Sequence, residues 1–320
     1  MKTDRLIKRS LIFTFCLAML MACSDDDGPS NQQLLTDQGI IEDFLSANNI
    51  TAEKSDRGFY FRPLVSNASG EAVQNNDIVS IYYDLSILNG QLIHSVEAPD
   101  DPVQILFGGL LVIPAGLELA LEEMRVGETY EFFIPSDLSY SNYSYQSLIP
   151  ALGITRLEIE VVRIDDVESQ KAAEEDRILE YLEAQGLDGA EAKEDGLYYV
   201  QTEAGTGDPP NNRQLISVNY TGTLLNGVKF DSSFDRNEPF NFQVGAGQVI
   251  QGWDLGFQDL TVGEKGFLLI PSHLAYGPNI YITPPDIIED LINQGSLRPF
   301  PSEIPPYATL VFEVEVVDFL

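Results

Sequence analysis

The chain of 320 residues contains few cysteines, histidines and basic side chains. Its two cysteines, Cys16 and Cys23, both lie near the N-terminus. This excludes a disulfide framework, a cysteine-based metal site and a catalytic thiol in the body of the chain. The 18 Lys and Arg residues stand against 50 Asp and Glu, a formal net charge of −32. Such a chain repels phosphate backbones, so nucleic acid is not an expected partner.

The rest of the composition is that of a globular protein, with 44% hydrophobic and 21% charged residues. This balance excludes wholesale disorder and a collagen-like structure. The length favours about two domains.

The N-terminal segment 1–22 is expected to be a signal and not part of the fold. Basic side chains in residues 2–9 precede an apolar run of 12 residues from Leu11 to Ala22. A bilayer span needs about 20 residues, so this run is too short to cross a membrane and is typical of a secretory signal peptide. The segment ends in Leu20-Met21-Ala22-Cys23, which resembles a bacterial lipobox with Cys23 as the lipid acceptor. The alternative is an ordinary signal peptide with an incidental cysteine.

The lipobox resemblance implies a lipoprotein anchored in a membrane through Cys23. Ser24 follows the cysteine, which implies delivery to the bacterial outer membrane, facing the periplasm or the cell surface. Residues 23–36, which begin with an acidic run, are interpreted as an acidic tether. That run resembles a surface-targeting tag, although an acidic segment is also simply a soluble spacer.

The remainder of the chain is a duplication with a spacing near 137 residues. The repeated anchors are Leu88-Asn89-Gly90 with Leu225-Asn226-Gly227, Val126-Gly127-Glu128 with Val262-Gly263-Glu264, and Ile134-Pro135-Ser136 with Ile270-Pro271-Ser272. Asn-Gly between alternating apolar residues is a strong hairpin signal. Trp253, Phe257 and Leu260 instead follow a helical period.

These patterns predict an α+β fold in which a curved antiparallel sheet wraps around a short helix in each repeat. The expected layout is a helical lead-in at 37–57, a first domain at 58–165, a helical connector at 166–195 and a second domain at 196–320.

The second repeat resembles the FKBP-type peptidyl-prolyl cis-trans isomerase family across residues 196–320. The motifs that carry the resemblance occur in family order: Asn219-Tyr220-Thr221-Gly222, Lys229-Phe230-Asp231-Ser232-Ser233, Val249-Ile250-Gln251-Gly252-Trp253, Ala275-Tyr276-Gly277 and Ile304-Pro305-Pro306-Tyr307. The resemblance implies two FKBP-like domains and a prolyl isomerase, or rotamase, that assists the folding of exported proteins. It also implies proline-containing polypeptides as partners and macrolide-type compounds as pocket ligands, with no cofactor and no metal.

The resemblance further implies a shallow apolar pocket in the second repeat, with Trp253 as its floor. The implied catalytic residues are Tyr220, Phe230, Asp231, Trp253, Tyr276 and Phe312. The implied substrate-binding residues are Arg236, Phe240, Gln248, Val249, Ile250 and Ile304, and the backbone N–H of Ile250 would hold a substrate carbonyl. Gln248 stands where the family often has an acid.

The first repeat lacks most of this signature. Tyr83 and Tyr140 keep the positions of Tyr220 and Tyr276, but other positions differ. Ile93 replaces Phe230, His94 replaces Asp231, Leu117 replaces Trp253, Leu157 replaces Phe312 and Ser141 replaces Gly277. We therefore expect a degenerate, inactive FKBP-like domain. His94 has no partner at metal-ligand spacing, so a surface or core histidine is the favoured interpretation.

The second repeat also has an insertion at 278–303, where the first has only residues 142–148. Residues 286–294 are expected to form a helical turn or two, above the mouth of the pocket, either as a lid or as a packed insertion. Two functional alternatives to an isomerase remain at this stage. One is a non-enzymatic chaperone that holds peptide in the same pocket. The other is a surface lipoprotein that uses the fold as a scaffold.

Overall fold

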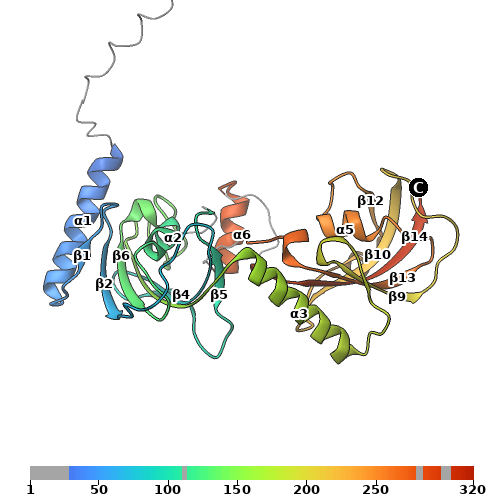
Figure 1. Cartoon of the computed structure of the whole chain (residues 1–320). Helices are drawn as coiled ribbons and strands as arrows, with labels where there is room; N and C mark the ends of the chain where they lie inside the picture. The colour runs from blue at the N-terminus through green and yellow to red at the C-terminus, as the bar shows by residue number, and fades with distance from the viewer. Residues whose placement is uncertain (1–28, 110–113, 279–283, 297–303) are drawn as a thin grey trace, which may run out of the picture.

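The computed structural model describes residues 29–109, 114–278, 284–296 and 304–320. It contains two domains of the same topology, joined by one helix (Figure 1). Each domain has a seven-stranded antiparallel sheet that curves around a short helix, as the duplication predicts. No helix in the described ranges is long and apolar enough to span a membrane.

The first domain is preceded by helix α1 (Pro29–Ala47). Its elements follow in the order β1 (Glu53–Lys54), β2 (Tyr60–Val65), β3 (Ile78–Ile87), β4 (Leu92–Val96), β5 (Val103–Leu106), α2 (Ala115–Leu121), β6 (Thr129–Ile134), η1 (Ser136–Leu138) and β7 (Thr155–Asp165). The sheet order is β1-β2-β6-β7-β3-β4, and β5 also pairs with β3.

The second domain repeats this arrangement after helix α3 (Val167–Gln185). Its elements are β8 (Glu191–Ala192), η2 (Glu194–Gly196), β9 (Tyr198–Glu203), β10 (Leu215–Leu224), β11 (Lys229–Ser232), α4 (Ser233–Arg236), β12 (Phe240–Gln243), α5 (Gln251–Gly256), β13 (Lys265–Ile270), η3 (Ser272–Leu274), α6 (Pro285–Asn293) and β14 (Leu310–Phe319). The sheet order is β8-β9-β13-β14-β10-β11, and β12 pairs with β10.

Strand pairing places equivalent residues at equivalent positions in the two domains. Leu85 pairs with His94 and Leu157, and Gly222 pairs with Asp231 and Phe312. Because side chains alternate between the two faces of a strand, this register brings the same set of positions over the short helix in each domain. The residues that pack there form one buried apolar cluster in each domain.

The lead-in helices are fastened to their domains by a buried carboxylate. Asp37 of α1 accepts hydrogen bonds from the backbone N–H and hydroxyl of Ser136, at 2.8 and 2.5 Å. Glu174 of α3 accepts the same pair of bonds from Ser272, at 2.6 and 2.7 Å. Both carboxylates are 1% exposed, and both serines follow an Ile-Pro dipeptide. This contact was not predicted from the sequence, although the aligned spacing of the two pairs could have indicated it.

Two expected boundaries differ from the structure. Helix α1 begins at Pro29, so residues 29–36, expected as tether, are helical. The short strands β1 and β8 lie inside segments expected to be wholly helical, where they extend the sheets past β2 and β9. Residues 1–28, with the expected signal segment and Cys23, lie outside the described residues.

The insertion of the second domain forms a helix where one was expected, over Pro285–Asn293. Its position differs from the expectation, because α6 does not cover the pocket of its own domain. Ile287 and Leu291 belong to the buried apolar cluster of the first domain. Figure 1 shows α6 beside β5 of that domain and apart from α5.

Candidate functional site

Trp253 is the centre of an aromatic cluster in the second domain. It lies on α5 and is 4% exposed. The rings packed against it, with their centroid distances, are Tyr220 at 4.9 Å, Phe257 and Phe312 at 5.2 Å, Phe242 at 5.4 Å and Phe240 at 5.9 Å. The Nε1–H of Trp253 is buried without a hydrogen-bond partner among the described residues. The indole is therefore held by ring packing from the sheet and from its own helix.

A polar triad lies at the edge of this cluster. The hydroxyl of Tyr220 donates to one oxygen of Asp231. Arg236 donates to the other oxygen of Asp231 at 2.5 Å and to the Tyr220 hydroxyl at 2.6 Å. The backbone N–H of Ser232 adds a bond to Asp231 at 2.8 Å. The structure thus brings together Tyr220, Asp231 and Arg236, three of the residues that the resemblance implies for the site.

The environment holds the triad in one ionisation state. Burial raises the pKa of Asp231, but hydrogen bonds from Tyr220 and Arg236 outweigh burial and hold that pKa below its ordinary value. Burial, together with the bond to Asp231, raises the pKa of Tyr220 to about 12. At neutral pH the pocket edge therefore carries a carboxylate, a neutral phenol and a guanidinium.

Other predicted residues surround the same cluster. Phe230 packs edge-on against Phe312, with centroids 5.5 Å apart. Val249, Ile250 and Tyr276 are partly buried against the cluster, and Ile304 is 4% exposed. Ile250 is the N-cap of α5 with an extended backbone, so its N–H lies outside the hydrogen-bond ladder of the helix.

Gln248 is placed differently from the other predicted residues. It is exposed, and its side-chain oxygen accepts from the backbone N–H of Gln243 at 3.1 Å. This bond fastens the turn before α5. The structure therefore shows Gln248 bound to its own loop, and its contact with substrate stays a prediction.

Gly222 is a site residue that our sequence interpretation did not single out for a role. A Cβ at this position would lie 2.7 Å from the ring of Phe230 and 2.9 Å from that of Phe312. Only glycine leaves room for both rings. The signal was present in the sequence, because the first repeat has Leu85 where the second has Gly222.

The first domain has an aliphatic version of the pocket. Tyr83 and Nδ1 of His94 form a hydrogen bond of 2.6 Å, in the place of Tyr220 and Asp231. Leu85 and Leu117 are fully buried where the second domain has Gly222 and Trp253. Burial lowers the pKa of His94, so this pocket edge carries no charge at neutral pH.

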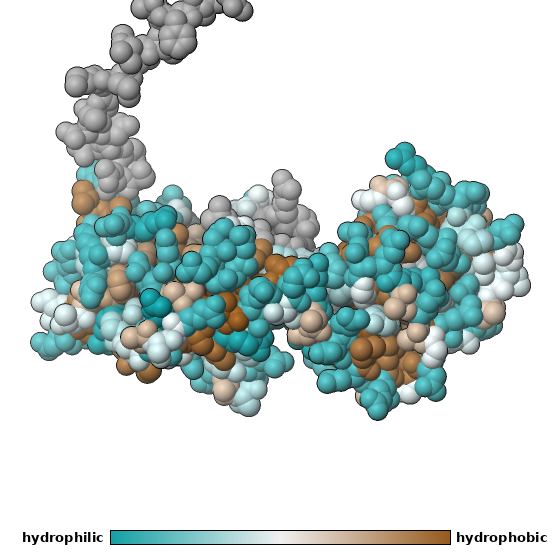
Figure 2. Space-filling model, viewed as in Figure 1, coloured by the Kyte–Doolittle hydropathy of each residue, from teal (hydrophilic) through white to brown (hydrophobic). Residues whose placement is uncertain are grey.

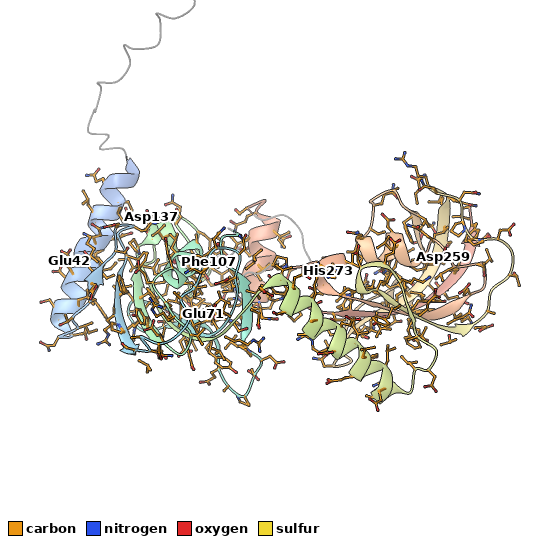
Figure 3. The ribbon with its side chains drawn as sticks, viewed as in Figure 1. Glu42, Glu71, Phe107, Asp137, Asp259 and His273 are labelled. Carbon is orange, nitrogen blue, oxygen red and sulfur yellow. The ribbon has the colours of Figure 1, made fainter. Side chains whose placement is uncertain are left out.

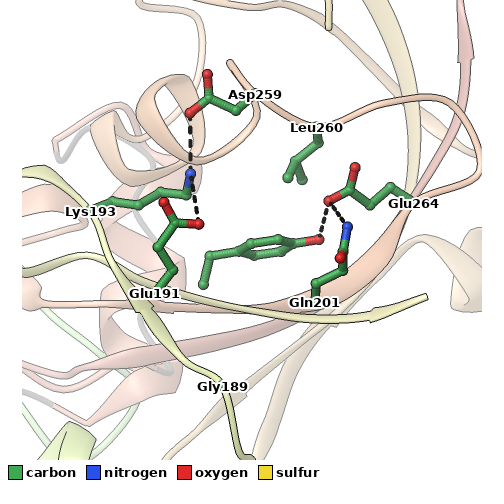
Figure 4. Close-up of a pocket in the computed structure, with 8 residues that line it drawn as sticks. Gly189, Glu191, Lys193, Gln201, Asp259, Leu260 and Glu264 are labelled. Carbon is green, nitrogen blue, oxygen red and sulfur yellow. Dashed lines mark hydrogen bonds and ion pairs between the residues drawn. The ribbon is translucent and has the colours of Figure 1, made fainter. Parts of the chain in front are cut away.

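A hollow of about 240 Å³ lies outside the aromatic cluster (Figure 4). Lys193 bridges Asp259 at 3.2 Å and Glu191 at 3.9 Å. Glu264 accepts from Tyr199 at 3.0 Å and from Gln201 at 2.8 Å. These pairings fasten β9 to the turn after α5, so we assign the hollow a structural role.

The histidines do not form a metal centre. His273 lies on η3, at the end of the second domain nearer to the first (Figure 3), whereas His94 lies on β4. Within the described ranges, no group of three or more His, Cys, Asp or Glu residues is arranged to hold a metal ion.

Comparison with known proteins gives a consistent result. Residues 69–162 and 207–317, well over half of the chain, match the family described as FKBP-type peptidyl-prolyl cis-trans isomerase. FK506-binding protein 1 of Candida glabrata is 43% identical over 129 residues, 40% of this chain and 96% of that protein. FKBP-type peptidyl-prolyl cis-trans isomerase FkpA of Aeromonas hydrophila is 40% identical over 154 residues, 48% of this chain and 47% of that protein. The crystal structure of FkpA from Escherichia coli matches with a TM-score of 0.35 and 35% identity, over 48% of this chain and 62% of that one.

Proposed function

Because the chain belongs to the family of FKBP-type peptidyl-prolyl cis-trans isomerases, we propose that its second domain performs the catalysis and the first does not. The observation that carries this proposal is the contrast between the two pockets. Five aromatic rings surround Trp253, and a charged triad lies at the pocket edge. At the matching positions of the first domain, Leu117 and Leu157 replace aromatic rings, and the pocket edge formed by Tyr83 and His94 carries no charge.

The aromatic pocket suits the reaction. Rotation about a peptide bond has a barrier of about 18–20 kcal/mol because resonance stiffens the C–N bond. Resonance also separates charge, and water stabilises the planar, charge-separated form. A pocket with Trp253 as its floor excludes water from the peptide bond. The planar ground state then loses more stabilisation by water than the twisted amide does, so the barrier to rotation falls. The cis and trans X-Pro isomers are close in energy, so lowering the barrier is sufficient for catalysis.

The polar triad supports this role by positioning. Tyr220 and Arg236 donate hydrogen bonds to the two carboxylate oxygens of Asp231. The negative charge of Asp231 therefore has a fixed position beside the apolar ring of Trp253. Such an edge orients the dipoles of the peptide groups that flank the prolyl bond. Neither a nucleophile nor proton transfer is needed in this scheme.

The substrates we propose are proline-containing segments of polypeptide chains. Phe240 at the pocket edge is 38% exposed, and Phe234 on the adjacent helix α4 is 58% exposed. Exposed aromatic rings beside a pocket offer apolar contact to residues that flank the proline. The names of relatives such as FK506-binding protein 1 support macrolide-type compounds as further ligands of the same pocket.

We also propose that the clients are exported proteins and that the chain is anchored to the bacterial outer membrane. The support is the lipobox-like segment Leu20-Met21-Ala22-Cys23 after an apolar run, followed by an acidic segment. Lipid on Cys23 would place the isomerase where exported chains fold.

The experiment that tests the assignment compares matched variants of the full chain in a prolyl isomerisation assay. Phe230→Ile with Phe312→Leu gives the second pocket the residues of the first, and we expect most of the activity to be lost. Tyr83→Phe removes the hydrogen bond to His94 in the first pocket, and we expect activity to be retained. Activity that is retained in the Phe230→Ile, Phe312→Leu variant but lost in Tyr83→Phe would assign catalysis to the first domain. A folded wild-type chain that binds unfolded protein but does not isomerise prolyl peptides would support the chaperone alternative.

A further inference from the structure

Helix α6 belongs to the second domain in sequence but to the first domain in its packing. The insertion that carries it begins and ends at the second pocket, where the N–H of Tyr307 donates to the carbonyl of Gly277 at 2.9 Å. Tyr276 and Ile304, on either side of the insertion, pack into the apolar cluster of the second domain. Ile287 and Leu291 pack into the cluster of the first domain. The insertion therefore connects the edge of one pocket with the core of the other domain.

The helix presents one apolar face to the first domain and one acidic face to solvent. Ile287, Ile288 and Leu291 are 0%, 3% and 6% exposed, whereas Asp286 and Glu289 are exposed. A helix of nine residues is too short to be stable alone in water, since isolated helices need about 12–15 residues. Burial against the first domain is thus what stabilises α6.

The buried cluster that α6 joins includes the first domain's counterparts of the second-domain pocket residues. The cluster that contains Ile287 and Leu291 also contains the residues that match the second pocket, namely Tyr83, Ile93, Leu117, Tyr140 and Leu157. Tyr143, whose ring lies 6.3 Å from that of Tyr140, donates its hydroxyl to Asp290 of α6 at 2.8 Å. Figure 2 shows hydrophobic residues (brown) on the side of the first domain that faces the second.

A chain of hydrogen bonds makes a second connection between the domains. Gln104 of β5 donates to Gln170 of α3 at 2.9 Å, and Gln170 donates to Glu174 at 2.9 Å. Glu174 accepts from Ser272, which begins η3 and the loop toward the insertion. Both connections thus run from the first domain to the same loop of the second.

We propose that the first domain is a docking domain, with α6 as the resident ligand of its pocket. The pocket takes a short amphipathic helix that presents aliphatic side chains at positions i and i+4, and a carboxylate at i+3 for Tyr143. Docking of α6 holds the edge of the catalytic pocket, at Tyr276 and Ile304, against the first domain. The loss of the catalytic signature in the first pocket follows from this role, because aliphatic residues complement Ile287 and Leu291.

Hydrogen exchange of the full chain tests the proposal. The amides of α6 should be protected in the wild type, and Ile287→Asp with Leu291→Asp should speed their exchange at least about tenfold. Tyr143→Ala, in the other domain, should also speed exchange in α6. The matched controls Ile40→Asp and Leu179→Asp change aliphatic residues that are 47% exposed on α1 and α3, and should leave α6 protected.

Two results would overturn the proposal. One is exchange of α6 in the wild type at the rate of an unstructured peptide. The other is unchanged protection of α6 in both the double variant and Tyr143→Ala. Protection of the β10 and β14 amides shows whether each variant is folded, and Ile287→Ala with Leu291→Ala replaces the aspartates if it is not.

A peptide of residues 284–296 provides a second measurement. In the double variant the first pocket is vacant, whereas in the wild type the tethered α6 competes for it at an effective concentration on the order of millimolar. The double variant should therefore bind the added peptide at least about tenfold more tightly than the wild type. Equal affinity for the two proteins would show that α6 does not occupy the site and would overturn the proposal.

Discussion

Replacing Trp253 with leucine gives the pocket that we propose as catalytic the residue that the first domain has at this position. The indole is 4% exposed and packs against five aromatic rings. Truncating a buried Trp to Ala typically costs about 3–5 kcal/mol of stability. Leucine keeps part of the volume, so we expect a cost of about 2–3 kcal/mol, which a domain of ordinary stability tolerates.

The expected effect on catalysis is larger than the effect on folding. Burying a proline-sized apolar group is worth about 1.5–3 kcal/mol, and much of that contact is with the floor. Because about 1.4 kcal/mol corresponds to a tenfold change in rate, Trp253→Leu should lower kcat/KM about 10-fold to 100-fold. The assay is the cis-trans isomerisation of an X-Pro test peptide, with thermal unfolding measured on the same sample.

Phe257→Leu is the matched control. Phe257 is fully buried one turn further along, with its ring 5.2 Å from that of Trp253, and it packs into the core. We expect a similar loss of stability and less than about a threefold loss of kcat/KM. A folded Trp253→Leu protein within about twofold of wild-type activity would refute the reasoning, because it would show that the aromatic floor is dispensable.

Three further changes test separate features. Asp231→Asn should lower kcat/KM about threefold to tenfold, a modest effect because the carboxylate is partly exposed; wild-type activity would show that its charge is not used. The pKa of Asp231 is lowered in the folded state, so its contribution to stability is present above the unfolded value of about 3.9 and is lost only as pH falls through the lower folded value. Melting curves from pH 8 to 3 check this, and an Asp231-dependent step near pH 6–7 would contradict it. Glu174→Ala leaves Ser272 without its acceptor and should cost about 1–3 kcal/mol in a denaturant titration, whereas Glu183→Ala on the exposed face of the same helix should be near neutral. Cys23→Ser should move the protein from the membrane fraction to the soluble fraction, and unchanged attachment would show that the anchor is misassigned.

The sequence predicted the features that depend on local pattern and register. The Asn-Gly turns set both hairpins, and the repeat spacing matched His94 with Asp231, which lie opposite Leu85 and Gly222 in the two equivalent registers. The family membership and the enzyme class were also available from motif order. These features are predictable because a two-residue turn fixes register, and register fixes which side chains share a face.

Features that depend on how the domains meet were not predicted. The apolar pattern of residues 287–291 predicted a helix, but a helical period does not say which surface buries it. The sequence interpretation placed this helix above the pocket of its own domain and did not consider the first domain. The hydrogen bonds from Ser272 to Glu174, which attach α3 to its own domain, were also not predicted, because they join residues far apart in the chain.

The order of the elements along the chain also has a consequence in time. The last strand of the first domain ends at Asp165, whereas its occupant α6 begins at Pro285. Because a chain is synthesised from its N-terminus, the first domain is complete long before the helix that fills it exists. During that interval the apolar pocket is open to any nascent apolar segment, including unfinished strands of the second domain. Once α6 has been synthesised, it can fill this pocket. The pocket of the first domain therefore closes only when synthesis of the second domain is almost finished.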